Sequence, residues 1–407
     1  MIIVERSTDK NEMKKLKPPL LIYGRRKTGK TFFVKSLFGD SYYFFVKRDR
    51  SIYFENRNEV INYREMIRIM EEFKEKMMIV DEFHRLPGDF LDWLHIRAPT
   101  NILLITSTLH LAKKLIGKHS PVLGLFLEYQ MTLIDERDIL INLEKHIKEP
   151  KRLVEMATYL REPILLRWFN KDLLSVLKHL KLVVPALVGE IFSEEDKELS
   201  ARYEGILRAL STGKGTLSEV ASMLHSYNLI EKQDIASIKP YVNTLIELSL
   251  VKRIPEYFRK RFYYFISSPM IDLYYYLDEK YNFSEADISD RCMIEKIPLH
   301  VEDFFRSLFS KLFRMRTFII NKPEMEVDIV LVEFKKLKVV AEIKWKNNVS
   351  RSEIKRAEEK LKKFKDCKKI LIVPEISVVE KEPKEIEIWD VKRILEEIKR
   401  IQASRLV

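Results

Sequence analysis

The fold is decided by Gly24-Arg25-Arg26-Lys27-Thr28-Gly29-Lys30-Thr31, which matches the pattern GxxxxGK[ST] in full. An apolar run at residues 19–23 precedes this stretch, and residues 30–38 read as a helix. Glycines let the backbone wrap a phosphate, so that successive N–H groups and the helix N-terminus face the anion. We expect Lys30 to neutralise the β- and γ-phosphates and Thr31 to ligate Mg²⁺. The sequence therefore predicts a phosphate-binding loop whose eight residues line ATP or ADP.

Two further apolar runs, at residues 77–80 and 101–106, alternate with polar helical stretches. This alternation predicts an α/β fold with a parallel sheet. The first run leads into Asp81, expected to hold Mg²⁺, and Glu82, expected to activate the attacking water. The second run leads into Ser107, which fits a contact with the γ-phosphate and, almost as well, a cap for a helix at 109–115. The chain is therefore predicted to be an ATPase.

The composition of the chain limits which binding partners and which cellular compartment are plausible. The formal net charge of +12 makes a polyanion such as DNA a plausible partner, although solvated lysines on helix faces would give the same excess. The two cysteines, Cys292 and Cys367, support neither a disulfide framework nor a zinc site. Apolar runs are too short to span a bilayer, and the N-terminus does not read as a signal peptide. We expect a cytoplasmic protein with no membrane partner.

Residues 136–190 are helical in pattern, and residues 201–268 then predict three helices and a hairpin. That order is typical of a winged helix-turn-helix. The third helix would present Lys239 and Asn243, with Thr244, and basic side chains on the wing would neutralise DNA phosphates. The predicted wing residues are Lys252, Arg253, Arg259, Lys260 and Arg261. The alternative is a winged helix used for protein packing.

The last segment predicts an α+β domain with carboxylates on successive elements. Glu302 lies on a helix, Asp328 on one strand, and Glu342 with Lys344 on the next. Alternation along a strand places Glu342 and Lys344 on one face. Such oxygens suit Mg²⁺ or Mn²⁺ bound by Asp328 and Glu342, and a neighbouring lysine suits phosphodiester hydrolysis. The alternative is a cross-strand salt-bridge face on a non-catalytic fold.

Two family resemblances bring these segments together. The sequences YGRRKTGKT, VDEFHRLP, the run ending in TST, and HSPVLG resemble the archaeal ATPase family of the AAA+-like group over residues 1–280. The C-terminal pattern is similar to the PD-(D/E)xK nuclease superfamily and to DUF234-type domains. The resemblance implies a P-loop ATPase core (1–135), a helical lid (136–200), a winged helix (201–285) and a restriction-endonuclease-like domain (290–407). Gly124-Leu125 departs from the family's Gly-Arg, so a candidate arginine finger is missing.

The leading hypothesis is an ATP-hydrolysing, DNA-binding protein with a metal-dependent nuclease-like domain. One alternative is a nucleotide-state switch that binds a partner protein or its own copies, with the nuclease fold as a scaffold. Another is a DNA-binding regulator with structural ATP. Arg161 and Arg167 are candidates for phosphate contact from the lid, and equally for surface residues.

Overall fold

The computed structural model describes residues 2–403 apart from 109–111, 113–121, 123, 171, 195, 196 and 323. The helix expected at 109–115 and most of HSPVLG lie outside the described residues. The chain forms two compact units. The N-terminal unit comprises Arg6–Ile134 and Pro185–Leu199, and the C-terminal unit comprises Met1–Glu5, Asp135–Val184 and Ser200–Val407. The division into four domains stays a prediction, but residues 136–184 pack within the C-terminal unit.

A seven-stranded sheet in the order β4-β3-β2-β5-β6-β1-β7 forms the centre of the N-terminal unit. The strands are β1 (Leu20–Tyr23), β2 (Tyr42–Val46), β3 (Ile52–Phe54), β4 (Glu59–Ile61), β5 (Met78–Asp81), β6 (Ile102–Thr106) and β7 (Leu127–Gln130). Five neighbouring strands of the sheet run parallel, namely β2, β5, β6, β1 and β7. β3 and β4 continue the sheet beyond β2 as an antiparallel edge. The predicted parallel sheet is confirmed, and β6 lies between β1 and β5.

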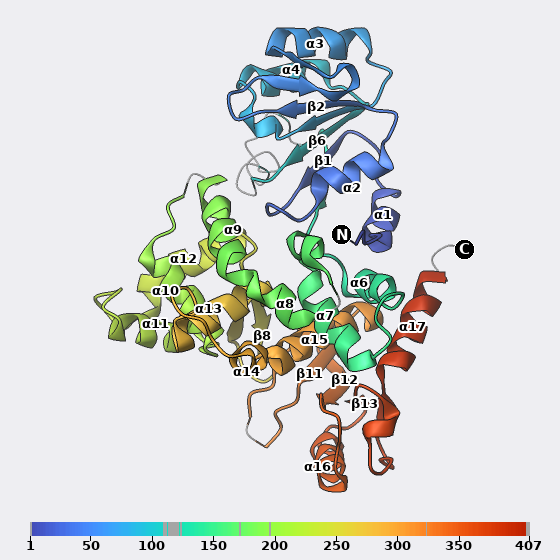
Figure 1. Ribbon diagram of the computed structural model, residues 1–407, viewed down its shortest axis with the longest axis vertical. Helices are drawn as coiled ribbons and strands as arrows, with labels where there is room; N and C mark the ends of the chain where they lie inside the picture. Colours follow the sequence, from blue (N-terminus) through green and yellow to red (C-terminus); the bar gives the residue numbers. More distant parts are fainter. Residues whose placement is uncertain are drawn as a thin grey trace. The chain divides into compact units, whose positions relative to one another are not determined.

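Helices cover both faces of this sheet (Figure 1). They are α1 (Ser7–Met13), α2 (Lys30–Leu37), α3 (Tyr63–Glu72) and α4 (Asp89–Arg97), with short 3-10 turns at Glu55–Arg57 and Phe83–Arg85. Side chains of β1 alternate between the two cores: Leu21 packs on the side of α3 and α4, whereas Leu20 and Ile22 pack on the side of α2. Burial on both faces explains why β1, β5 and β6 read as continuous apolar runs.

The C-terminal unit begins with helices and a hairpin. The helices are α6 (Glu136–Leu143), α7 (Pro150–Leu160), α8 (Leu173–Lys178), α9 (Leu180–Glu194), α10 (Ala201–Ser211), α11 (Leu217–Ser226), α12 (Ile235–Glu247), α13 (Pro269–Tyr281) and α14 (Asp290–Ile294), with a 3-10 helix at Pro163–Trp168. The antiparallel hairpin of β8 (Val251–Pro255) and β9 (Phe262–Ile266) follows α12. The chain passes from the C-terminal to the N-terminal unit within α9, at Pro185. Three helices and a hairpin occupy 201–266, and naming them a winged helix stays a proposal.

A mixed sheet in the order β10-β11-β12-β13-β14 closes the C-terminal unit. Its strands are β10 (Arg316–Phe318), β11 (Ile329–Glu333), β12 (Lys336–Ile343), β13 (Lys368–Ile372) and β14 (Glu387–Trp389). The accompanying helices are α15 (Ile297–Phe313), α16 (Arg351–Lys362) and α17 (Val391–Ala403), with a 3-10 turn at Ile376–Val378. Ile354, Ala357 and Leu361 of α16 pack on the sheet face that carries Val340. Residue 342 shares that face, because side chains alternate along β12.

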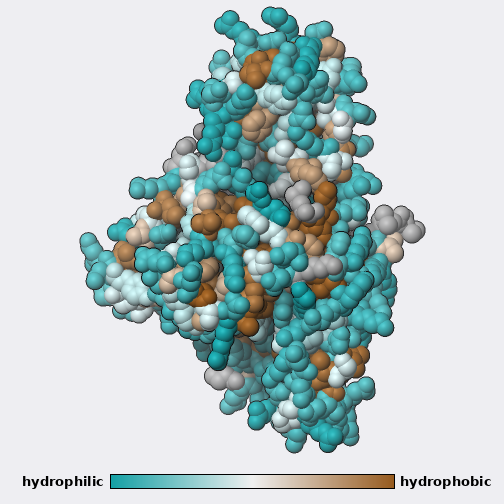
Figure 2. Space-filling view, in the orientation of Figure 1, coloured by the Kyte–Doolittle hydropathy of each residue, from teal (hydrophilic) through white to brown (hydrophobic). Residues whose placement is uncertain are grey.

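Hydrophilic side chains cover most of the face drawn in Figure 2, with hydrophobic side chains in scattered patches. Within the described part of the chain, no helix combines the length and the apolar character needed to cross a membrane.

Candidate functional site

The phosphate-binding loop connects β1 to α2 and is shaped by two glycines. A Cβ atom at Gly24 would lie 2.1 Å from the Met131 carbonyl oxygen, so only glycine fits there. Gly29 precedes α2 with φ of 88°, in the left-handed region that glycine enters without strain. Lys30 Nζ donates to the Gly24 and Arg25 carbonyl oxygens at 2.8 and 3.1 Å, which curls its side chain over the loop. The ammonium group is therefore placed at the concave side of the loop.

Arg6, which the sequence analysis missed, fixes the outer side of this loop. Its guanidinium donates to the Thr28 carbonyl oxygen at 2.7 Å and to the Thr132 carbonyl oxygen at 2.9 Å. Arg6 also pairs with Asp9 at 2.6 Å. Three segments distant in sequence thus meet at one buried side chain. A lone arginine ahead of the first strand gives no motif by which to predict this role.

The Asp81 carboxylate, at the end of β5, lies against the first turn of α2. Its Oδ2 atom accepts hydrogen bonds from the Thr31 and Tyr43 hydroxyls, each at 2.5 Å. Burial raises the pKa of Asp81, while these two hydrogen bonds oppose the rise. Burial and the Asp81 charge also raise the pKa of Tyr43, so its hydroxyl remains a donor. Tyr43 is a second residue that the sequence analysis missed.

Glu82 is held beside Asp81 by neighbours from three segments. The Ser107 hydroxyl donates to Glu82 Oε2 at 2.9 Å, and His84 Nδ1 lies 3.4 Å from the same oxygen. Arg26 Nη1 lies 3.7 Å from Glu82 Oε1, and Arg26 Nε lies 2.6 Å from Glu190 Oε1. Because β6 lies between β1 and β5, Ser107 at the end of β6 is brought to the acidic pair. All the residues predicted to bind nucleotide lie at this one edge of the sheet.

The chemistry of these groups fits magnesium and a polyphosphate. Thr31 and Asp81 offer the hydroxyl and carboxylate oxygens that Mg²⁺ prefers, and Mg²⁺ usually keeps several water ligands besides one or two protein ligands. Lys30 and the amides at the start of α2 suit phosphate oxygens. No group of three or more His, Cys, Asp or Glu side chains gathers as a metal site within the described ranges. A site completed by nucleotide and water is consistent with that finding.

Comparison with known proteins agrees with this geometry. Residues 16–139 match the family model described as an AAA domain. This part of the chain is similar to that family, and residues 16–139 are called the AAA domain below. The match supports nucleotide binding and a P-loop ATPase fold for it. No curated protein matches the chain significantly.

Similar solved structures are distant from this chain. The Walker-type ATPase of Pyrococcus abyssi is 15% identical, with 67% of this chain and 96% of that chain covered and a TM-score of 0.46. A signal transduction ATPase with a tetratricopeptide repeat sensor from Pyrococcus horikoshii is 14% identical, with coverages of 76% and 46% and a TM-score of 0.31. The Aeropyrum pernix Orc1 protein in complex with DNA is 13% identical, with coverages of 69% and 93% and a TM-score of 0.29.

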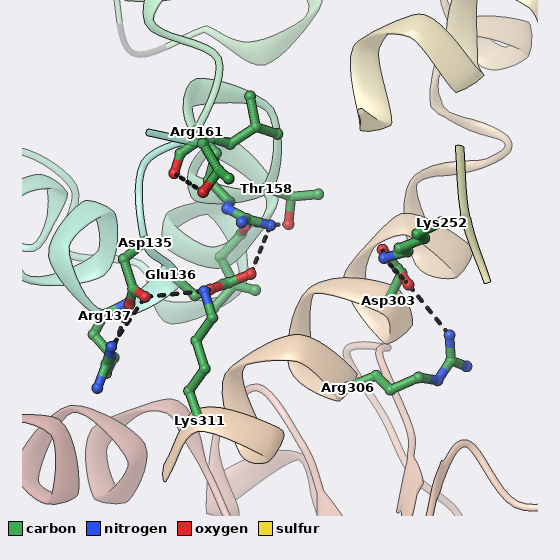
Figure 3. A network of polar contacts seen from close by, with 12 residues as sticks. Asp135, Glu136, Arg137, Thr158, Arg161, Lys252, Asp303, Arg306 and Lys311 are labelled. Carbon is green, nitrogen blue, oxygen red and sulfur yellow. Dashed lines mark hydrogen bonds and ion pairs between the residues drawn. The ribbon is translucent and has the colours of Figure 1, made fainter. Parts of the chain in front are cut away.

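Outside the AAA domain, the residues predicted to bind DNA divide into two sets. Lys239, Asn243, Arg253, Arg259 and Lys260 are exposed. Lys252 Nζ instead lies 2.6 Å from Asp303 Oδ2 on α15, and Arg261 pairs with buried Glu256 (Figure 3 shows the Lys252 pair). The charges of Lys252 and Arg261 are therefore largely neutralised within the protein. Sequence reasoning could not detect a partner fifty-one residues away from Lys252.

In the C-terminal unit the charges of Asp328 and Glu342 act on the carboxyl group of Glu302. Burial first, and then Asp328 and Glu342, raise the pKa of Glu302 to about 7. Asp328 Oδ2 accepts from the Ile343 amide at 2.6 Å. Glu342 pairs with Lys360 of α16, whereas Lys344 Nζ is 3.9 Å from Glu342 Oε1. Glu342 is thus paired with Lys360, which the sequence analysis did not single out, and among the described residues these carboxylates do not form a group of three or more that could hold a metal ion.

The lid arginines have partners within the C-terminal unit. Arg161 Nη1 lies 2.7 Å from Oε1 of fully buried Glu136 (Figure 3). Lys311 of α15 contacts the same Glu136 and lies 2.9 Å from Asp135 Oδ2. Arg167 is exposed and lies over the Trp168 ring. Arg161 therefore joins α6, α7 and α15, and its charge is balanced there.

Proposed function

We propose that the AAA domain binds Mg²⁺-ATP and hydrolyses it. The observation that carries the proposal is the convergence of Thr31, Asp81 and Glu82 at the mouth of the phosphate-binding loop. Lys30 binds the β- and γ-phosphates, and Thr31 with Asp81 would hold the Mg²⁺ that offsets their charge. Glu82 accepts a hydrogen bond from the attacking water and orients it, while Ser107 positions Glu82 and reaches toward the γ-phosphate.

Calorimetry with ATP and ADP, followed by steady-state hydrolysis, tests these roles. Lys30→Ala should abolish nucleotide uptake, because the loop loses its phosphate-neutralising charge. Glu82→Gln should keep the affinity and lose turnover by at least about a hundredfold. Lys14→Ala, at an exposed position just after α1, is a control for handling and folding. Normal hydrolysis by Glu82→Gln would reject its assignment, and well-folded wild-type protein that takes up neither nucleotide would reject the whole proposal.

We further propose that nucleotide occupancy is communicated through Arg26 to α9. Arg26 belongs to the phosphate-binding loop, and its guanidinium is ion-paired with Glu190 on α9. A γ-phosphate competes with Glu190 for that guanidinium, since both are anions, and Arg48, 3.8 Å from Glu190, can hold Glu190 when Arg26 turns to the phosphate. Because α9 continues into the C-terminal unit, a shift in this pairing provides a route for nucleotide control of that unit.

For the C-terminal unit we propose DNA binding through α12 and the β8–β9 hairpin. Exposed Lys239 and Asn243 on α12, together with Arg253, Arg259 and Lys260, support the proposal. Lys252 and Arg261 are left out because Asp303 and Glu256 neutralise them. Replacing Arg253, Arg259 and Lys260 by alanine should weaken duplex binding and flatten its salt dependence by up to about 3 units of log–log slope. Unchanged salt dependence would instead favour a protein partner and a scaffold role for the nuclease-like fold.

A metal-dependent phosphodiesterase is the second candidate function. The coupling of Glu302, Asp328 and Glu342 near Lys344 favours it, whereas the Glu342–Lys360 pair disfavours a metal in this arrangement. The test incubates linear, supercoiled and branched DNA with Mg²⁺ or Mn²⁺, with and without ATP. Cleavage lost in both Asp328→Ala and Lys344→Ala would support the activity. Intact DNA in every condition would leave the domain as a scaffold.

A further inference from the structure

The turn between β11 and β12 places a phenylalanine where a small residue would be expected. Phe334 and Lys335 both have positive φ, 45° and 65°, between the paired residues Glu333 and Lys336. Two-residue turns of this kind favour Asn-Gly or similar pairs, because a bulky residue in the left-handed region is strained. The Phe334 side chain is 92% exposed, so its burial does not compensate for that strain. Strained residues that packing does not explain are found preferentially at functional sites.

The β8–β9 hairpin loop lies against this turn. The Tyr257 hydroxyl donates to the Lys335 carbonyl oxygen at 3.4 Å, and the backbones of Tyr257 and Ile319 are hydrogen bonded at 2.8 Å. The Tyr257 ring meets the Phe258 ring edge-on, with 5.0 Å between centroids. Phe258 is itself 43% exposed. The loop and the turn are therefore neighbouring parts of one surface within the C-terminal unit.

Cations surround the exposed rings of this surface. Lys322 Nζ lies 4.0 Å from the centre of the Phe258 ring. Arg259 and Lys260 are exposed on the hairpin loop, and Lys335 and Lys336 on the turn. Glu333 is the exposed acid of these two segments, since Glu256 is buried against Arg261. Glu324 and Glu326, further along the loop of Lys322, lower the local excess of positive charge without reversing it.

We propose that this aromatic–basic surface (Phe258, Arg259, Lys260, Lys322, Phe334, Lys335 and Lys336) binds an unpaired strand of nucleic acid. The Phe334 ring stacks on a base, and the cations neutralise the flanking phosphates. Stacking on an exposed ring requires a base that is free of its neighbours, which a duplex does not offer. A protein partner fits poorly, because interface centres are depleted of charge and this ring stands among lysines. The inference rests on the proposed nucleic-acid binding and names the form of the nucleic acid.

Fluorescence anisotropy with a labelled oligo-dT of twenty nucleotides and a mixed-sequence duplex of the same length tests the proposal. Phe334→Asn removes the ring but suits the turn, because asparagine tolerates the left-handed region. It should weaken strand binding about tenfold, change duplex binding less than twofold and keep or raise the melting temperature. Phe334→Trp should retain strand binding. Replacing Lys335 and Lys336 by alanine should lower the salt slope for the strand by about 1.4. Replacing exposed Lys355 and Arg356 of α16 by alanine is the control, because it removes the same charge elsewhere.

The outcomes separate this inference from the wider proposal. An unchanged affinity of Phe334→Asn for the strand overturns the inference, and so does an equal loss of affinity for strand and duplex. Wild-type protein that binds anionic phosphatidylserine vesicles but not the strand also overturns it. A wild-type protein that binds duplex but not strand overturns this inference alone. A protein that binds neither DNA form overturns DNA binding as well, while calorimetric ATP uptake continues to report on the AAA domain.

Discussion

Tyr43 donates its hydroxyl hydrogen to Asp81 Oδ2, the same oxygen that accepts from Thr31. The tyrosine stands on β2 and the aspartate on the neighbouring β5, two residues from direct pairing, since Asp81 pairs with Phe45 and Tyr43 pairs with Ile79. The Tyr43 ring belongs to the same core as Phe33 and Val34 of α2, so this hydrogen bond fixes the carboxylate on the α2 side of the sheet. Tyr43 is thus placed to set the orientation of the proposed magnesium ligand.

Tyr43→Phe should raise the Mg²⁺ concentration needed for half-maximal ATP hydrolysis about three- to tenfold. The reason is that a hydrogen bond to a charged group contributes roughly 1.5–3 kcal/mol, part of which orients Asp81. Hydrolysis measured across a magnesium titration gives this value. Tyr42→Phe, one residue earlier on β2, is the matched control because its ring packs against Phe54 and Phe73 in the core on the other face of the sheet. A magnesium dependence identical to wild type in Tyr43→Phe would remove Tyr43 from the site.

Glu190→Gln should tighten ATP binding about three- to tenfold. Glu190 Oε1 lies 2.6 Å from Arg26 Nε, so a phosphate that binds this guanidinium must compete with Glu190. Removing the charge of Glu190 lowers the free energy needed to free the Arg26 guanidinium for the phosphate. Isothermal titration with ATP and ADP measures the change, and Glu55→Gln, which alters the exposed pair with Lys35, serves as control. Weaker binding in Glu190→Gln would show that Glu190 supports the loop instead of competing with nucleotide.

The sequence predicted those elements whose signals are local. β1, β5 and β6 are buried on both faces and read as apolar runs, and the loop from Gly24 to Thr31 carries its own motif. β7 escaped prediction because its residues Leu127–Gln130 are mostly exposed at the sheet edge and lack an apolar pattern.

Contacts between distant segments could not be predicted in the same way. Arg6 reaches Thr28 and Thr132 only once α1 has packed against the loop, and no spacing rule connects these positions. Likewise, the sequence predicts Lys252 as a DNA-binding residue of the wing, and only the packing of α15 brings Asp303 to it. Strand pairing and helix packing set these contacts, which involve residue pairs far apart in sequence.

Lys311→Met should lower the free energy of unfolding of the C-terminal unit by about 2–4 kcal/mol. Burial would raise the pKa of Glu136, but Arg161 and Lys311 lower it below its ordinary value, so this carboxylate is charged at neutral pH. Removing the lysine leaves Asp135 and Glu136 close together with less positive charge. Chemical denaturation at pH 7 measures the loss.

The control for Lys311→Met is Lys399→Met, which removes the more exposed pair with Glu144 and should cost at most about 1 kcal/mol. Equal losses in the two variants would contradict a special role for the network drawn in Figure 3.

Glu302→Gln should stabilise the C-terminal unit above pH 7 and leave it nearly unchanged at pH 5. Burial and the neighbouring carboxylates raise the pKa of Glu302 from 4.5 to about 7. The folded state therefore binds this proton more tightly than the unfolded state, and stability falls as pH rises from about 4.5 through 7. Glutamine carries no charge and escapes that loss, which amounts to at most about 3 kcal/mol. Denaturation profiles in EDTA between pH 5 and 8 measure the difference, with Glu359→Gln on the exposed face of α16 as control. A constant offset between Glu302→Gln and wild type across this range would mean that Glu302 is ionised throughout, and that the three carboxylates are not electrostatically coupled.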